Sequence, residues 1–349
     1  MNPRGADTLP ATGRSQPYTA GDVTIAIVTR NRRDELARAL RSALEQVGDP
    51  EVLVVDDGST DGTAAMVRGE FPSVRLVRFE HPAGIAVRRN DVTDAVRGSL
   101  ILSIDDDAIF TSPTTVLETV RDFDHPRIAL VGIPLIDVYV SPEELQRSPE
   151  PARPWVAAVF RAGAFAVRRD VLQEVGGFGS WVYHQGEEWD LSLRLLGAGW
   201  LIRLGRAEGP VHHLASPHRS LRNRDVYGRR NELLISHRYF PSPWNVLYLV
   251  GYAARGLAHG LRVGRSANML RGLAAGLIEC LRLRRQPLAR PSFRTERHLR
   301  RRGGLPLVEV ERRLHLPPLD WPAVPRDRVG EESPLRAGRP STGRIRSAP

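Results

Sequence analysis

The chain has 349 residues, of which 41% are hydrophobic and 26% are charged, so it can bury the core of one large globular domain or two small ones. Its single cysteine, Cys280, excludes an internal disulfide and favours a reducing compartment. All 50 basic residues are arginine, and the net charge is +10. Residues 1–200 hold 21 arginines and 29 acidic residues, whereas residues 201–349 hold 29 and 11. The basic second half would attract anionic lipid, phosphorylated substrates or nucleic acid.

The first elements in chain order predict a strand followed by a helix. Residues 1–20 are rich in Pro, Gly, Ser and Thr, and we expect a disordered lead that lacks the apolar core of a signal peptide. The β-branched run Val23–Thr29 predicts the first strand. Arg30, Asn31 and Arg32 end it. Apolar residues at helical spacing then predict a helix: Leu36, Leu40, Ala43, Leu44 and Val47.

Further strands alternate with helices along the next part of the chain. Apolar runs predict strands at Val52–Val55, Val74–Val77 and Ser99–Ile104, and Gly84–Arg97 reads as a helix before the last of them. Strands and helices that alternate in this way indicate a parallel sheet with right-handed crossovers. The expected fold class is therefore α/β with a mostly parallel central sheet.

Three consecutive acids, Asp105, Asp106 and Asp107, come directly after the apolar run of the last strand. Side chains alternate along an extended chain, so Asp105 and Asp107 point the same way. Two carboxylates on one side repel each other unless a cation lies between them, and a hard divalent cation with oxygen ligands is the usual solution. The simpler alternative is an acidic turn after a strand.

Several motifs together resemble those of family 2 glycosyltransferases. They are Val23–Arg32 around the first strand, Val54–Thr63 with its Val-Val-Asp-Asp-Gly-Ser-Thr-Asp-Gly-Thr sequence, Arg88-Arg89-Asn90, the acids Asp105–Asp107, and the later stretch Gly186–Arg194. The resemblance covers roughly residues 21–240. It implies a GT-A fold, a nucleotide-sugar donor, a divalent metal (Mn or Mg) and inversion at the anomeric carbon, in a non-processive enzyme.

The resemblance assigns donor and metal sites to particular residues. It implies that the metal is held by Asp105 and Asp107, and that a histidine close to the diphosphate or the metal, a candidate metal ligand, is either His212 or His213. The donor nucleotide is expected to contact residues at strand ends and on the helix before the acids: Thr29, Arg30, Asp56, Asp57, Arg89, Asp105 and Asp106. A plain strand-to-helix turn explains the residues after Asp56 equally well, and a solvated helix face remains the alternative for Arg89.

An acidic motif, Glu187-Glu188-Trp189-Asp190, is expected to supply the catalytic base. By its position in the family motif Glu188 is the preferred base, with Glu187 and Asp190 as further catalytic candidates. Glutamate stands where the family usually has aspartate, which keeps the carboxylate and lengthens its reach. The alternative is the charged first turn of an amphipathic helix, favoured there by the helix dipole, with its buried side formed by leucines: Leu191, Leu193, Leu195 and Leu196.

After Pro243 the sequence becomes apolar and basic. We expect a GT-A domain over 21–240, amphipathic helices over 241–285 and a basic, largely irregular tail over 286–349. The run Trp244–Ala258 and the spaced apolar residues Met269, Leu270, Leu273, Leu277 and Leu281 are both shorter than the ~20 apolar residues of a membrane span. They fit a helix on an anionic membrane surface or, equally, a helical pair packed on the catalytic domain.

The expected activity is transfer of a sugar to an acceptor hydroxyl, including a lipid-linked one, in cell-envelope or other glycan synthesis. The expected location is the cytoplasm, with peripheral attachment to the inner face of the plasma membrane. No nucleic acid is expected, because aromatic and basic residues do not interleave. The alternatives are a non-catalytic sugar-nucleotide-binding or scaffold protein of this fold, and a metal-dependent nucleotidyltransferase.

Overall fold

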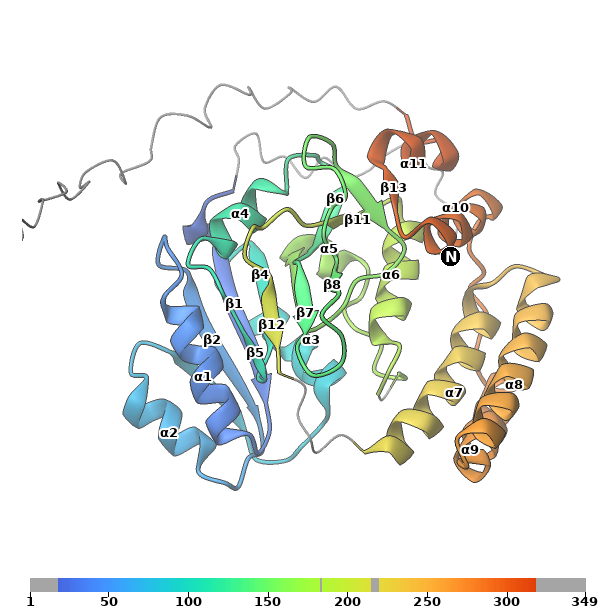
Figure 1. Cartoon of the computed structure of the whole chain (residues 1–349), viewed down its shortest axis with the longest axis horizontal. Coiled ribbons are helices and arrows are strands. Elements are labelled where there is room, and N and C mark those ends of the chain that lie inside the picture. Colours follow the sequence, from blue (N-terminus) through green and yellow to red (C-terminus); the bar gives the residue numbers. More distant parts are fainter. Residues whose placement is uncertain (1–17, 183, 215–219, 318–349) are drawn as a thin grey trace, which may run out of the picture. The chain divides into compact units, whose positions relative to one another are not determined.

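The computed structural model describes residues 18–182, 184–214 and 220–317 (Figure 1). Within these residues the main sheet has nine strands in the order β13-β9-β11-β6-β10-β4-β1-β2-β3. Its strands are β1 (Val23–Thr29), β2 (Glu51–Asp57), β3 (Arg75–Phe79), β4 (Leu100–Asp105), β6 (Ile128–Gly132), β9 (Trp155–Ala157), β10 (Ala164–Arg168), β11 (Leu201–Leu204) and β13 (Leu305–Pro306).

Helices cover both faces of this sheet. The helices on one face are α1 (Arg33–Leu44), α2 (Thr63–Glu70) and α4 (Thr115–Arg121), and those on the other are α3 (Ile85–Ala95), α5 (Arg169–Glu174) and α6 (Glu187–Gly197). Because side chains alternate along a strand, Ile25 and Ile27 of β1 pack toward α1 while Ala26 packs toward α3. Burial on both faces explains the continuous apolar runs of the central strands.

The sheet is mixed, with a parallel centre. β1 pairs in parallel with β2 and β4, and β2 pairs in parallel with β3, as predicted from the sequence. β10 runs antiparallel between β4 and β6. The predicted helix after β1 ends at Leu44, and Leu44 and Val47 are 42% and 48% exposed, so only the first part of the apolar pattern faces the core.

A small second sheet is formed by β5 (Ala108–Ile109), β12 (Val211–His213), β7 (Leu135–Asp137) and β8 (Glu144–Leu145), in that order. β12 pairs antiparallel with β5 and parallel with β7, so His213 lies between Ala108 and Asp137. The pairing brings a distant segment beside the residues that directly follow β4.

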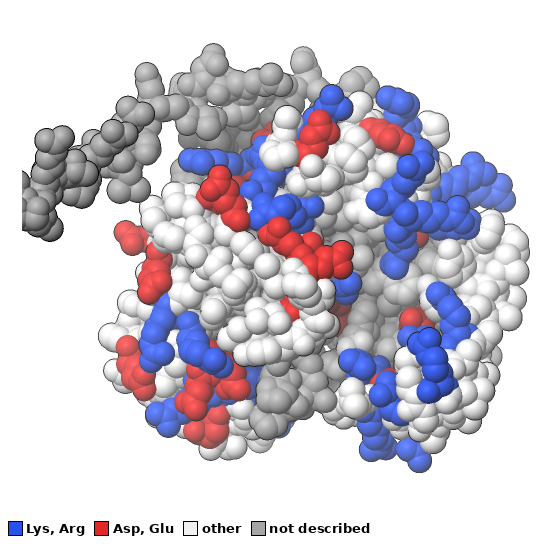
Figure 2. All heavy atoms as spheres, viewed as in Figure 1, with Lys and Arg blue, Asp and Glu red and all other residues white. Residues whose placement is uncertain are grey.

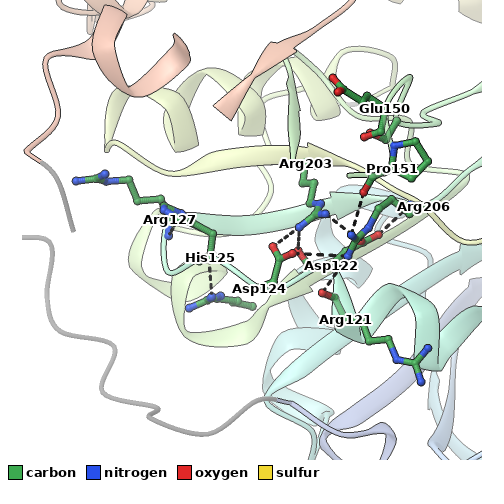
Figure 3. Close-up of polar contacts among 11 residues, drawn as sticks. Arg121, Asp122, Asp124, His125, Arg127, Glu150, Pro151, Arg203 and Arg206 are labelled. Carbon is green, nitrogen blue, oxygen red and sulfur yellow. Dashed lines mark hydrogen bonds and ion pairs between the residues drawn. The ribbon is translucent and has the colours of Figure 1, made fainter. Parts of the chain in front are cut away.

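Buried ion pairs fasten the chain after α4 to β11 (Figure 3). The carboxylate of Asp122 lies 3.3 Å from Arg203 Nη2 and 2.6 Å from Arg206 Nε, and it also accepts from the Arg206 backbone N–H. Arg203 pairs with Asp124 as well. Burial raises the pKa of Asp122, and the two guanidiniums oppose that rise. Each carboxylate of this group thus has an arginine partner, and each arginine has a carboxylate partner, so no buried charge in it is left uncompensated.

The C-terminal half contributes three packed helices: α7 (Leu221–Tyr239), α8 (Trp244–Arg262) and α9 (Ser266–Cys280). Among the described residues, none of the helices is both long enough and apolar enough to cross a bilayer. Residues 1–17 and 318–349, where we expect most of the lead and the end of the tail, lie outside the described part. Ala20–Asp22 form a short 3-10 helix, η1, before β1.

The chain beyond Gln286 differs from the irregular tail that we expected. Arg290–Arg302 form α10 and Leu307–Leu314 form α11, with β13 between them pairing against β9. Leu299, Leu307 and Val310 are buried in the main core, and Arg127 pairs with Glu311. The apolar positions of these helices are few and lie among many arginines, which hides the helical period in the sequence.

Candidate active site

Strand register gathers polar residues at one edge of the main sheet. Thr29 at the end of β1 lies opposite Asp56 of β2, and Val28 lies opposite Asp105 of β4. The strands are parallel, so their carboxyl ends share this edge, where open α/β sheets bind ligands. Thr29, Asp56 and Asp105 are therefore brought together from three separate parts of the sequence.

Asp105, Asp107 and His213 form a group with the ligand types of a divalent-cation site. Their ligand atoms all lie within 4.8 Å of one another. His213 Nε2 lies 3.1 Å from Asp107 Oδ1 and 3.6 Å from Asp105 Oδ2. Its other ring nitrogen, Nδ1, faces the carboxylate of Asp137, an arrangement typical of histidines that ligate metals. The two carboxylates approach the same imidazole, but through a turn at Asp106 and Asp107 and not through the strand alternation that we expected, because β4 ends at Asp105.

The strand phase of β12 distinguishes the two neighbouring histidines. His213 is buried within the group, whereas His212 is only half-buried and lies outside it. Burial works against protonation of His213, but its hydrogen bonds to Asp105 and Asp107 outweigh burial and raise the pKa of His213 to about 10. The imidazole thus sits in a strongly negative field, as a cation at this place would.

Asp106 turns away from the group and is held by the end of β1. Its carboxylate accepts from Thr29 Oγ1 at 2.8 Å and from Arg32 Nη1 at 2.6 Å. Arg32 also reaches Asp107 Oδ2 at 3.1 Å. Burial raises the pKa of Asp106 to about 7, against the opposing charge of Arg32. Asp106 and Arg32 therefore fix the acidic loop to β1 and leave Asp107 facing His213.

Arg89 of α3 connects the cation-type group to the second acidic motif. It is 5% exposed. Its Nη2 donates to Asp105 Oδ1 at 3.0 Å, and its Nη1 lies 3.8 Å from Glu187 Oε1. Arg89 is thus a buried guanidinium held between two carboxylates, and its burial excludes the solvated helix face that was the alternative for it.

The second motif begins α6. Gly186, the residue before the helix, has φ 102°, a left-handed conformation that glycine adopts without strain. Glu187 is buried and Glu188 is half-buried in the first turn. Burial, and then the neighbouring charge of Glu187, raise the pKa of Glu188 to about 7. A carboxylate with a pKa near the working pH suits a general base.

Asp190, the third acid of this motif, is engaged by other side chains. It is fully buried and accepts from Tyr239 Oη at 2.6 Å and from Arg194 Nη2 at 2.6 Å. Tyr239 belongs to α7, so this contact joins α7 to α6. The four leucines after Glu188 are all buried, as the amphipathic pattern predicts.

The residues predicted to bind the donor at the ends of β2 and β1 differ in how far other side chains already engage them. Asp57 accepts from the backbone N–H of Ala83 and of Gly84, at 2.8 and 3.0 Å, and from Arg88 Nε at 2.6 Å. It thereby fixes the segment before α3. Among the residues that the structure describes, the hydrogen-bond donor to Asp56 is the Ser59 backbone N–H at 2.8 Å, and Arg78 Nε lies 3.6 Å from its second oxygen. Arg30 is exposed.

The model of the family described as glycosyl transferase family 2 matches residues 24–229, which is more than half of the chain. The chain belongs to glycosyl transferase family 2. The match spans β1 to the first part of α7, and it confirms the resemblance inferred from the motifs.

Named relatives of this family 2 transferase cover it in part. It is 39% identical over 92 residues to the succinoglycan biosynthesis protein ExoU of Rhizobium meliloti, which is 26% of this chain and 27% of ExoU. It is 38% identical over 109 residues to ExoO, another succinoglycan biosynthesis protein of that organism, which is 31% of this chain and 28% of ExoO. The chain thus spans little more than a quarter of the length of these relatives.

Solved structures support the fold. The mannosyltransferase PcManGT of Pyrobaculum calidifontis, in complex with GDP-Man and Mn²⁺, superposes with a TM-score of 0.51 at 18% identity, over 74% of this chain and 87% of PcManGT. Residues 1–349 of TarS from S. aureus superpose with a TM-score of 0.51 at 14% identity, over 80% of this chain and 91% of TarS. The α/β fold of GT-A type expected from the motifs is confirmed.

Two residues that contact the candidate site, Arg32 and Asp137, were not predicted from the sequence. Arg32 could have been predicted, since a basic residue close after the first strand can reach the neighbouring strand end. Asp137 could not, because it ends a three-residue strand whose place beside β12 is a tertiary feature.

Proposed function

We propose that this enzyme transfers a sugar from a nucleoside-diphosphate donor to an acceptor hydroxyl, with inversion at the anomeric carbon and with bound Mn²⁺ or Mg²⁺. One observation carries the proposal. Asp105, Asp107 and His213 form a cation-type ligand set, and Arg89 spans from that set to the motif that holds Glu188. Ligands for a diphosphate-bound cation and a candidate base thus lie on two sides of one guanidinium.

On the donor side, Asp105, Asp107 and His213 would hold the metal, which when bound supplies Lewis-acid neutralisation of the leaving diphosphate. These ligands fit a divalent cation, because two carboxylate oxygens and one imidazole nitrogen lie within 4.8 Å of one another. Arg89 would bind a donor phosphate. One oxygen of Asp56 has no hydrogen-bond donor among the described residues and has Arg78 Nε 3.6 Å away, and we assign Asp56 to the nucleotide, beside Thr29 and Arg30.

On the acceptor side, Glu188 would take the proton of the attacking hydroxyl. The acceptor oxygen forms the new bond to the anomeric carbon as the bond from that carbon to the diphosphate oxygen breaks, and the nucleoside diphosphate leaves with the bonding pair. One displacement without a covalent enzyme intermediate inverts the anomeric centre. Glu187 would orient Arg89, and Asp190 would position α6 through Tyr239 and Arg194.

The acceptor class follows from the names of the relatives. ExoU and ExoO are succinoglycan biosynthesis proteins, and RfbC of Myxococcus xanthus, 24% identical over 227 residues, is an O-antigen biosynthesis protein. We therefore assign the acceptor to a cell-envelope glycan, carried on a lipid at the inner face of the plasma membrane. We also assign catalysis to residues 21–240 and acceptor-side support to the helices after them.

The first test is thermal stabilisation by UDP-, GDP- and dTDP-sugars, each with Mn²⁺ and with EDTA. A donor at about 100 times its Kd adds about 2.7 kcal/mol to the free energy of unfolding. We expect one donor class to stabilise the chain with Mn²⁺ only. Asp107→Ala should lose this effect, because it removes a ligand of the proposed metal.

Asp94→Asn is the matched control, since Asp94 is an exposed acid on α3 outside the site. It should respond to the donor as the unaltered chain does. Stabilisation that persists in EDTA would contradict the metal, and no response to any donor would contradict the donor class.

A further inference from the structure

Helix α8 leaves an apolar stripe uncovered. Val246, Val250, Leu257 and Leu261 recur at intervals of four and seven residues, which places them on one side of the helix. Val250 is 64% and Leu261 76% exposed. The opposite side of α8 packs on α7 and α9 through buried residues, including Tyr252, Gly256 and Gly260. The stripe is therefore a separate surface and no part of the bundle core.

Helix α9 carries a second stripe of the same kind. Leu270, Leu277 and Leu281 recur at intervals of seven and four, and Leu281 is 88% exposed. Met269 and Leu273 of the same pattern are buried toward α7, so the apolar spacing in the sequence divides between a core side and an open side. Together the two stripes form what we call the α8–α9 face: Val246, Leu247, Val250, Leu257, Leu261, Leu270, Leu277, Ile278 and Leu281.

Arginines border the α8–α9 face. Arg271 and Arg282 directly follow Leu270 and Leu281 and lie beside the α9 stripe, whereas Arg255 and Arg262, seven residues apart, lie on the side of α8 toward α7. None of the four pairs with a carboxylate of the described residues. The sequence from 233 to 278 has no acidic residue. Figure 2 shows uncoloured surface bordered by blue groups on the side formed by these helices.

This combination of charge and apolar area decides between occupants. A second copy of the chain would place arginines against arginines around the rim. An anionic bilayer instead offers hydrocarbon for the stripes and phosphates for the guanidiniums, and each guanidinium near such a surface raises the affinity about fivefold. In Figure 1 the turn between α8 and α9 lies at the lower end of the view, as do the carboxyl ends of β1 and β2 that carry the site.

We propose that the α8–α9 face docks flat on an anionic phospholipid bilayer, with Arg271 and Arg282 at its border against the lipid phosphates. The inference rests on the proposed action at a membrane surface, and it specifies the surface and the lipid chemistry. Docking of this kind would hold the sheet edge with the site beside lipid-borne acceptors.

The test is co-sedimentation of the full chain with phosphatidylcholine vesicles, with and without phosphatidylglycerol. We expect binding to the anionic vesicles only, weakened by salt because exposed charges are screened. Val250→Asp with Leu261→Asp should abolish binding. Arg271→Gln with Arg282→Gln should lower it about 30-fold, since each basic residue near an anionic surface contributes about 1 kcal/mol, or about fivefold.

Matched controls lie on other elements. Val308→Asp changes a 64% exposed valine of α11, and Arg97→Gln changes an arginine with an 80% exposed side chain, so both should bind as the unaltered chain does. Asp107→Ala should also bind vesicles, which separates failure of docking from failure of transfer. Absence of vesicle binding, unaltered binding by both pairs of variants, or a dimer in solution that Val250→Asp with Leu261→Asp converts to a monomer would each overturn the proposal.

Discussion

Replacing Tyr239 by Phe tests whether Asp190 acts as a positioning residue. The substitution removes one hydroxyl and leaves the ring that packs in the buried cluster of α6, α7 and α10. Burial, and then the charge of Asp190, raise the pKa of Tyr239, so the phenol stays protonated and donates. After the change, Asp190 keeps Arg194 as its partner but loses the 2.6 Å bond from α7.

The magnitude follows from the burial of the acceptor. A hydrogen bond to a charged group contributes about 1.5–3 kcal/mol to stability, and Asp190 is fully buried, so water cannot replace the lost donor. An unfolding entropy of about 2.1 cal/mol/K per residue, over roughly 300 residues, gives about 0.6 kcal/mol/K. The expected fall in Tm is therefore about 2–5 °C.

Thermal and guanidinium unfolding measure this change, with Tyr139→Phe as the control, because Tyr139 is 74% exposed. We expect kcat to fall because α6 carries Glu188, while the acid limb of the pH–rate profile stays in place. A Tyr239→Phe protein with unaltered stability would refute the argument that this bond joins α6 to α7. A shifted acid limb would indicate that Asp190 itself titrates in the reaction.

Three other predictions address the site and the fold. Glu188→Gln should lower kcat about 10²–10⁴-fold. In the unaltered enzyme the rate should fall as the pH drops below about 7, because Glu188 is then protonated. A rate that does not change with pH over about one unit on either side of that value would contradict this role. Asp137→Asn should weaken Mn²⁺ binding about 10–100-fold by calorimetry, whereas His212→Ala should leave it unchanged. Arg203→Met should cost about 3–5 kcal/mol in guanidinium unfolding, because it strips a buried carboxylate of one partner; a loss below about 1 kcal/mol would mean that Arg206 suffices.

The centre of the fold was predictable because local pattern and tertiary structure agree there. β1 occupies the predicted residues, since a strand buried on both faces must be apolar throughout. The prediction of these strands needs only the period of the chain and the rule that parallel strands end at one edge. The approach of Asp107 to Asp105 does not follow from strand alternation, because β4 ends at Asp105 and a turn sets the direction of Asp107.

Other features depended on contacts that the sequence does not reveal locally. The choice of His213 over His212 requires the phase of a three-residue strand, and the role of Asp137 requires the pairing of β12 with β7. The engagement of Asp190 depends on Tyr239, 49 residues later. In α10, apolar positions such as Phe293 and Leu299 stand among arginines, so composition concealed a helix that packing reveals.

Strand β13 and the helices beside it show that the folded core of this chain extends beyond the residues that match the family. The family match ends at residue 229, yet Leu305 pairs with Val156 at the border of the sheet, and Leu299, Leu307 and Val310 fill its core. A fragment cut at the end of the match would expose that apolar area and would leave β9, which still pairs with β11, with an open edge that is a template for aggregation. Expression of the matched region as a free-standing unit therefore requires the chain through residue 317.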